Sequence, residues 1–326
     1  MPFLLEKWMR WKGCGFLPAC IGPGEGTCVT RMKMTSRIAG MVLGVAAVLV
    51  AAGMPDATHA GSVTASALEL SAGEKAAWHF YRAGQYEKAL AAFQSLEING
   101  DVCALYGLGV MATNGFGMAR DDAKALEWFR EGAAKGSRQA QYGLGAMYDL
   151  SRGVRKDLTE AIDWYERSAK AGYAPAQTRL GQMNLLGRGM QRHYGKAFYW
   201  FFQSAKAGDR DGEYYFGMMF IRGWGTRRDL KQAQIWIRKA AEKGQPLAMR
   251  MLSTLYEGGY GVPQSDRDAL AWLKKSAGAG DREAMQRLAA VYESGSFGVK
   301  QDRDMARLLK KKASVPKKVV FPDYAI

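Results

Sequence analysis

The fold is decided by residues 137–172, which read S-R-Q-A-Q-Y-G-L-G-A-M-Y-D-L-S-R-G-V-R-K-D-L-T-E-A-I-D-W-Y-E-R-S-A-K-A-G. Ala140, Leu144 and Tyr148 follow one another at intervals of four residues, which places them on one face of a first helix. Gly145 adds a position without a side chain, where a second helix can approach closely. The stretch therefore begins with a helix that is built to pack against a neighbour.

A second helix follows in the same stretch. Asp157 is a good N-cap, because its side chain can accept a hydrogen bond from the first free backbone amides. The packing face of this helix is predicted to consist of Ala161, Trp164, Tyr165 and Ser168. The tryptophan is expected to be buried between the helices of its unit and the next. Gly172 supplies the left-handed position at which many helices end. The 36 residues thus predict one pair of helices.

This pair is repeated along the chain with a period of 36 residues. Five kinds of position recur in one register: a tryptophan, an alanine, a helix-ending glycine, a leucine or phenylalanine, and a small residue. The tryptophans are Trp128, Trp164, Trp200, Trp236 and Trp272, and the glycines are Gly100, Gly136, Gly172, Gly208, Gly244 and Gly280. In the capping position, His193 and Ser265 replace the usual aspartate, and in the last unit Asp302 comes one residue late. The shift predicts an insertion in the last loop.

The repeated pattern A-x-x-x-L-G-x-x-Y-x-x-G-x-G-V-x-x-D-x-x-x-A-x-x-W-x-x-x-S/A-A-x-x-G resembles the Sel1-like repeat, a relative of the tetratricopeptide repeat. The resemblance covers residues 101–314 as six units. It implies an all-α fold, a right-handed superhelical α/α solenoid of helix pairs, whose common role is a protein-binding scaffold. Residues 72–100 resemble a tetratricopeptide unit and are expected to form an N-terminal cap.

The N-terminal region carries an export signal. Residues 38–54 form an uncharged apolar run with basic residues before it and small residues after it. We expect residues 32–60 to be a signal peptide cut after Ala60. Residues 1–31 precede this signal and are expected to be an upstream extension outside the mature protein, with translation starting at Met32 or Met34. An uncleaved membrane anchor is the alternative, since 17 apolar residues are near the minimum for a span.

The remaining ends are short. Residues 61–71 are expected to be a linker, and residues 315–326 a C-terminal tail in which two prolines prevent a helix. The tail either folds over the last helix pair or contacts a partner. The sequence thus predicts a bacterial protein that is exported to the periplasm or secreted. Its oligomeric state is left open.

Composition and motifs argue against several classes of protein. With 48% hydrophobic and 24% charged residues, the chain is neither a disordered polyelectrolyte nor a multi-span membrane protein. The formal net charge is +15, yet no nucleic-acid-binding motif is present. We find no sequence motif of a catalytic, metal or cofactor site, and expect none. Cys103, near a predicted helix start, is expected to be an inert thiol rather than a nucleophile.

Two sets of residues are candidates for binding a partner. The first is one column of the first helices, expected to line a concave surface: Tyr106, Tyr142, Thr178, Tyr214, Arg250 and Gln286. The second is a basic ridge in the loops between helices: Arg120, Lys156, Arg192 and Arg228. Tyrosine and arginine are frequent interface anchors, and a row of cations suits an acidic partner.

These observations favour an exported adaptor or assembly scaffold that binds another protein or peptide, with an acidic one as a candidate. The alternatives are a secreted cell-wall or hydrolase-like enzyme with its site in the solenoid groove, and an accessory protein of polysaccharide export. An enzyme would require two or more titratable side chains to meet in one pocket.

Overall fold

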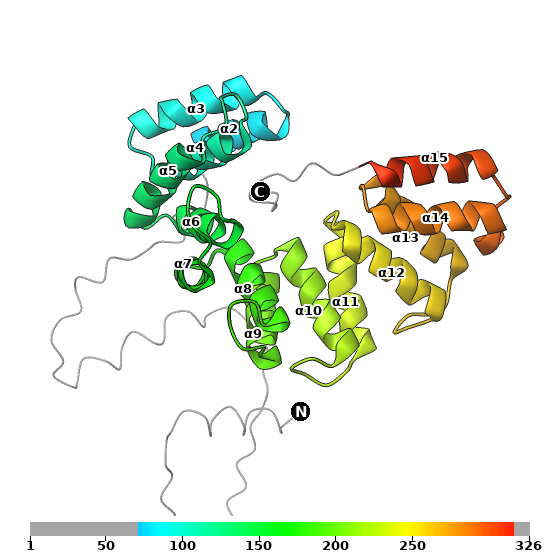
Figure 1. Ribbon diagram of the computed structural model, residues 1–326. Coiled ribbons are helices and arrows are strands. Elements are labelled where there is room, and N and C mark those ends of the chain that lie inside the picture. Colours follow the sequence, from blue (N-terminus) through cyan, green and yellow to red (C-terminus); the bar gives the residue numbers. More distant parts are fainter. Residues whose placement is uncertain (1–70, 316–326) are drawn as a thin grey trace, which may run out of the picture. The chain divides into compact units, whose positions relative to one another are not determined.

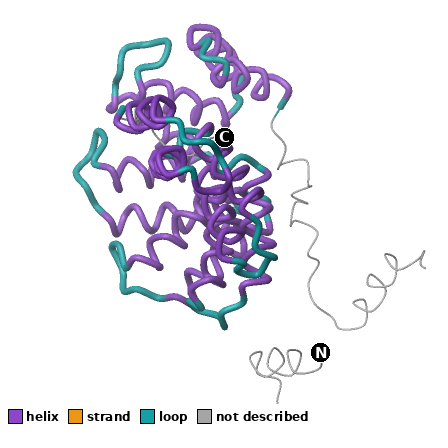
Figure 2. Tube along the Cα trace, turned by 90° about the vertical axis from the view of Figure 1, so that its right-hand side faces the viewer, coloured by secondary structure: helices purple, strands orange, loops and turns teal. Residues whose placement is uncertain are grey.

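The computed structural model describes residues 71–315, and all regular structure in this range is helical. Figure 2 shows helices joined by loops, without a strand among these residues. The predicted all-α class is therefore confirmed. The expected upstream extension, the signal peptide, residues 61–70 of the linker and residues 316–326 of the tail lie outside the described residues.

The helices alternate between the first and the second member of each pair. The first helices are α2 (Ala72–Arg82), α4 (Val102–Asn114), α6 (Arg138–Leu150), α8 (Ala174–Leu186), α10 (Arg210–Arg222), α12 (Pro246–Gly258) and α14 (Arg282–Ser294). The second helices are α3 (Tyr86–Ile98), α5 (Asp122–Ala134), α7 (Leu158–Lys170), α9 (Tyr194–Lys206), α11 (Leu230–Glu242), α13 (Asp266–Gly278) and α15 (Arg303–Ser314). A short 3₁₀ helix, η2 (Ser296–Gly298), precedes α15.

The helix pairs are stacked in chain order as a solenoid. Each helix packs against the one before it and the one after it (Figure 1). The buried hydrophobic residues accordingly form a succession of clusters along the stack rather than one central core. Such an arrangement is typical of repeat proteins, in which each unit is stabilised mainly by its neighbours.

The deepest side chain of each second helix directly follows the tryptophan. This buried column consists of Phe129, Tyr165, Phe201, Ile237 and Leu273, and each is at most 1% exposed. The tryptophans themselves are only half-buried, so the expectation that they form the buried core is wrong. A helix turns by about 100° per residue, which moves the tryptophan to the edge of the packing face. At this edge the tryptophan ring contacts a cationic side chain. Lys239 Nζ, for example, lies 4.1 Å from the centre of the Trp236 ring.

Glycines in the first helices make room for the buried column. The ring of Phe129 is held between Gly109 on α4 and Gly143 on α6. A Cβ atom at Gly143 would lie 2.6 Å from the ring, which no real contact allows. Gly145 on α6 has the same role against Tyr165, with a Cβ distance of 2.8 Å. The close approach predicted at Gly145 is therefore confirmed.

The capping positions follow the sequence pattern. Asp157 accepts hydrogen bonds from the amides of Thr159 and Glu160. His193 also caps its helix, since its Nδ1 atom accepts a hydrogen bond of 3.1 Å from the amide of Lys196. Histidine and serine thus replace aspartate without loss of the cap.

The predicted insertion in the last loop is present. The second helix α15 is capped by Asp302 and begins at Arg303, one residue later than the period requires. The extra residue is accommodated in η2, where Phe297 has a φ of 56°, a conformation that side chains other than glycine rarely adopt.

The two adjacent columns of the second helices should differ in their contribution to stability. Phe201→Ala is expected to lower the free energy of unfolding by about 3–5 kcal/mol, because it empties a fully buried site. Trp200→Ala removes a larger but half-buried side chain and should cost clearly less. Urea denaturation of both variants checks the order. Equal losses, or a larger loss for Trp200→Ala, would contradict the assignment of the buried column.

Candidate functional site

The predicted binding column of the first helices is mostly buried. The exposed fraction is 2% for Tyr106, 1% for Tyr142, 0% for Thr178 and 9% for Tyr214. These four side chains cannot line an open surface, so the prediction is corrected here. Gln286, in the last unit, is exposed.

The physical reason is that this column contacts the following unit. Thr178 Oγ1 donates a hydrogen bond of 2.9 Å to Asp209, the N-cap of α10. The ring of Tyr142 packs against Tyr173, the N-cap residue of α8, with 5.4 Å between ring centres. Burial raises the pKa of Tyr173 to about 12. The column therefore stabilises the junction between units and is not free for a partner.

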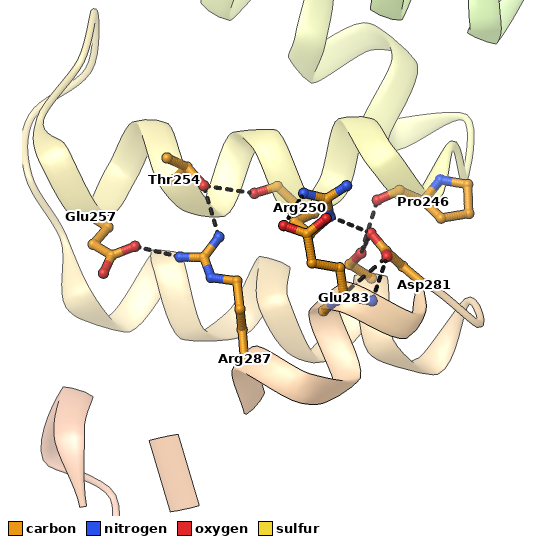
Figure 3. A network of polar contacts seen from close by, with 9 residues as sticks. Pro246, Arg250, Thr254, Glu257, Asp281, Glu283 and Arg287 are labelled. Carbon is orange, nitrogen blue, oxygen red and sulfur yellow. Dashed lines mark hydrogen bonds and ion pairs between the residues drawn. The ribbon is translucent and has the colours of Figure 1, made fainter. Parts of the chain in front are cut away.

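Arg250 is occupied in the same way. Its Nε atom lies 2.6 Å from Asp281 Oδ2, and its Nη1 atom lies 2.9 Å from Glu283 Oε1 (Figure 3). Asp281 also accepts hydrogen bonds from the backbone amides of Glu283 and Ala284 at the start of α14. The guanidinium group thus joins α12 to the cap of α14.

A second set of ion pairs joins successive first helices, and the sequence pattern did not reveal it. Arg287 on α14 contacts Glu257 on α12 at 2.6 Å and donates to Thr254 Oγ1 at 2.9 Å (Figure 3). Three units earlier, at the equivalent positions, Arg179 on α8 pairs with the fully buried carboxylate of Asp149 on α6. In the sequence, each of these ion pairs corresponds to an arginine thirty residues after an acidic residue. This spacing occurs in only some units, so the repeat pattern did not reveal it.

The basic ridge, in contrast, is exposed as predicted. Arg120, Lys156, Arg192 and Arg228 each directly precede the N-cap of a second helix. Two of them make local contacts: Arg120 pairs with Asp122 at 2.5 Å, and Arg192 lies 5.5 Å from the ring centre of Tyr194.

Lys156 and Arg228 belong to two recesses that are open to solvent and equivalent by the repeat. The first recess has a volume of about 510 Å³ and is lined by Tyr148, Val154, Arg155, Lys156, Asp157 and Leu158. The second has a volume of about 760 Å³ and is lined by Phe220, Thr226, Arg227, Arg228, Asp229, Leu230, Lys231 and Gly261. Six lining positions of the first recess reappear in the second, two units further along. Each recess combines an aromatic ring, a leucine and two adjacent cations.

The electrostatics of the recesses favour an anion. Each lies at the N-terminus of a second helix, where the aligned backbone dipoles leave a partial positive charge. The capping carboxylates, Asp157 and Asp229, are held by backbone amides of the helix, and offset only part of the charge of the two cations beside them. The arrangement can bind a carboxylate or another acidic group while apolar atoms pack against the ring and the leucine.

One group of titratable side chains does meet in space, in a place that the sequence did not indicate. Single ligand atoms of Glu74, Asp101 and Cys103 all lie within 4.8 Å of one another. Burial raises the pKa of the Cys103 thiol to about 12, and the charges of Glu74 and Asp101 add to this shift. The thiol is therefore protonated at neutral pH and is a poor nucleophile, which supports the inert cysteine that the sequence analysis expected.

Among the helices of residues 71–315, none combines the length and the apolar character that a membrane span requires.

Comparison with known proteins places this geometry among repeat proteins. The Sel1 repeat matches six segments: residues 104–137, 138–173, 174–209, 211–245, 246–281 and 282–314. A Sel1 repeat protein from Oxalobacter formigenes is 27% identical, with a TM-score of 0.65 over 76% of this chain and 98% of that one. A protective antigen present in uropathogenic Escherichia coli strains, also with this fold, is 29% identical with a TM-score of 0.55 over 74% of this chain. The match spans 53% of that antigen's length. No curated protein matches the chain.

The raised pKa of Cys103 has a direct consequence for its reactivity. In the folded protein at pH 8, iodoacetamide should alkylate Cys103 far more slowly than in the urea-unfolded chain. Glu74→Gln removes a negative charge that disfavours the thiolate, so it should lower the pKa and speed the reaction. Mass spectrometry of the Cys103 peptide measures both rates. Equal rates in the folded and the unfolded chain would show that the thiol is not held protonated.

Proposed function

The chain belongs to the Sel1 repeat family, and from this premise we propose that it is an exported adaptor that binds an acidic segment of another protein along its basic ridge. Sel1 repeat proteins commonly mediate contacts between proteins and are generally scaffolds rather than enzymes. The observation that carries the proposal is the occurrence of the same basic recess twice, at Lys156 and at Arg228.

The repetition favours a partner that is extended rather than compact. Equivalent positions in adjacent units lie on every second helix, and two helices cannot lie closer than about 10 Å. Two recesses that are two units apart are therefore separated by at least about 20 Å, a distance that an extended peptide covers in about six residues or more at about 3.3 Å each. The preferred partner is therefore a segment with acidic residues about six positions apart and apolar residues beside them.

Charge also argues for this surface over the first-helix column. The ridge cations Lys156 and Arg228 are exposed and line recesses that residues 71–315 leave open. The polar groups of the column are engaged within the stack, as Thr178 and Arg250 are. The basic ridge would raise the association rate of a negatively charged partner and make binding more specific for it.

Export is supported by the sequence. The apolar run at residues 38–54, with basic residues before it and Ala60 after it, has the organisation of a secretory signal. A protein that enters the periplasm or the medium meets acidic segments of secreted and envelope proteins, for which a basic ridge is suited.

Charge reversal in one recess tests the binding surface. Arg227→Glu with Arg228→Glu should weaken binding of a labelled peptide that has glutamates six residues apart by about tenfold or more, because the recess loses its two adjacent arginines, gains two negative charges and keeps only Lys231. Fluorescence anisotropy measures the affinity. For the unmodified protein, affinity should also fall as salt is added.

The matched control is Lys311→Glu with Lys312→Glu on α15, which changes the formal charge of the chain by the same amount. These residues are exposed and far along the stack from the recess, so the affinity should change little. Equal weakening by both variants would mean that net charge alone drives binding. Preferential binding of an acidic polysaccharide over the peptide would favour a role in polysaccharide export instead.

Export has its own test. Expression of the full chain in a Gram-negative host should yield a periplasmic or secreted protein whose first residue is Gly61, as read by N-terminal mass spectrometry. Peptides from residues 1–31 should be missing from the cell. An intact N-terminus in the cytoplasm would contradict this part of the proposal.

A further inference from the structure

An apolar patch interrupts the outward face of the second helices at α9 and α11. It consists of Tyr199, Phe202 and Ile235, which are 52%, 39% and 43% exposed. On α9 the buried residues, such as Ala197 and Phe201, lie on the opposite face of the helix. The patch is therefore directed away from the packed interior.

Neighbouring units carry charged or small residues at the same positions. In units one, two and five the equivalents of Tyr199 and Ile235 are Glu127, Asp163 and Ala271, and the equivalents of Phe202 are Arg130, Glu166, Arg238 and Lys274. In the last unit, whose second helix begins one residue late, the equivalent of Tyr199 is Leu308, which is 44% exposed. The repeat therefore folds without large apolar groups here. Their presence in two adjacent units needs a different explanation, and exposed apolar patches usually mark interaction sites.

Rings packed beneath the surface link the part of the patch on α9 to the part on α11 through Phe216, which is 4% exposed. The ring of Phe202 lies 5.5 Å from that of Phe216 on α10, which in turn lies 5.1 Å from the ring of Trp236 on α11. Tyr199 packs edge-on against Trp200 at 5.1 Å. The other four tryptophans of the repeat carry a lysine or arginine over the ring instead. At Trp200, the ring of Tyr199 therefore takes the place of the cation that lies over each of the other four tryptophans.

Charges of opposite sign lie on the two sides of the patch. On α7, toward the N-terminus, Asp163 and Glu166 occupy the equivalent positions, and Glu166 pairs with Lys170. On the other side, Arg238 of α11 donates to Tyr256 at 2.6 Å, and Lys274 of α13 lies 6.0 Å from the ring centre of Tyr292. Along the stack, the outward face is therefore acidic on α7, aromatic on α9, aliphatic at Ile235 of α11, and basic from Arg238 of α11 to Lys274 of α13.

We propose that this face binds a second copy of the same chain, with a two-fold axis that runs parallel to the helices between α9 and α11. Such an axis sets α9 against the partner's α11, and α7 against the partner's α13. The ring of Tyr199 then meets the apolar Ile235, the ring of Phe202 meets the guanidinium group of Arg238, and the acidic side of each copy meets the basic side of the other. A surface that is complementary to itself in this way is what a symmetric dimer requires.

The repeat supplies the register. Positions that are 36 residues apart lie at the same level in successive units, so Tyr199 meets the partner's Ile235, and Phe202 meets the partner's Arg238. Glu166 likewise meets the partner's Lys274. Every contact occurs twice because of the symmetry. Three apolar side chains in each copy are few for a permanent dimer, so we expect a reversible one.

The test uses residues that the chain already tolerates elsewhere. Tyr199→Asp and Ile235→Ala install the side chains of units two and five, Asp163 and Ala271, so folding should be preserved. Sedimentation equilibrium of the purified full chain should show a monomer–dimer equilibrium, and the double variant should raise its dissociation constant at least about tenfold. Leu186→Asp, at another exposed apolar residue, is the control and should leave the equilibrium unchanged.

Charge exchange tests the two-fold arrangement itself. Glu166→Lys alone and Lys274→Glu alone should each weaken the dimer, since each sets like charges together twice. Both changes in one chain should restore it, because the pair is rebuilt in reverse. A chain that stays monomeric at the highest attainable concentration, a dimer that withstands Tyr199→Asp and Ile235→Ala, or no restoration by the exchange would each overturn the proposal.

Discussion

The structure depends on the insertion of one large side chain from each second helix between two first helices. Phe129 shows the constraint most clearly, since its ring is enclosed by Gly109 of its own unit and Gly143 of the next. A side chain at either glycine would fill the space that the ring needs. The contact with the first helix of the same unit recurs at Gly145, Gly181 and Gly217, whereas the position of Gly143 holds Arg179 and Tyr215 in the next units. The recurrence of the first contact every 36 residues keeps successive helix pairs alike along the stack.

The surfaces available for function follow from this packing. The first helices are covered along the column that holds Tyr142 and Thr178, because the next unit is drawn close by the buried ring. What remains open is the edge formed by the loops and the outward face of the second helices. The basic ridge lies on the former, and the apolar patch on the latter. One protein could therefore bind an acidic segment and a second copy of itself without competition between the two.

Much of the fold could be predicted, because its determinants are local. The left-handed glycines such as Gly172, the caps at Asp157 and His193, and the late start of the last helix all depend on residues close together in sequence. Tyr165 was predicted on the packing face, but the main core role was assigned to the tryptophan one residue earlier. Two adjacent positions recur with the same period, and the constant tryptophan drew attention from the neighbour that varies between phenylalanine, tyrosine, isoleucine and leucine.

The candidate site was harder to predict, because it depends on contacts between units. Spacing within one helix places Tyr106 and Arg250 on one column but does not tell which neighbour covers that column. Glu74 lies on α2, whereas Asp101 and Cys103 lie at the start of α4, so no sequence motif indicated that the three side chains meet. The ridge was predicted correctly as exposed, since charged loop residues beside a cap seldom find a buried position.

The most direct test of the account is a double-mutant cycle between Phe129 and Gly143. Alanine in place of glycine normally stabilises a helix by about 1 kcal/mol, but Gly143→Ala should lower the free energy of unfolding here because its Cβ meets the ring. In a chain that already carries Phe129→Ala, the same change should cost nothing or stabilise. The predicted result is a coupling energy of about 0.5–3 kcal/mol from urea denaturation. Additive effects of the two substitutions would contradict the claim that the inserted ring sets the spacing of the stack.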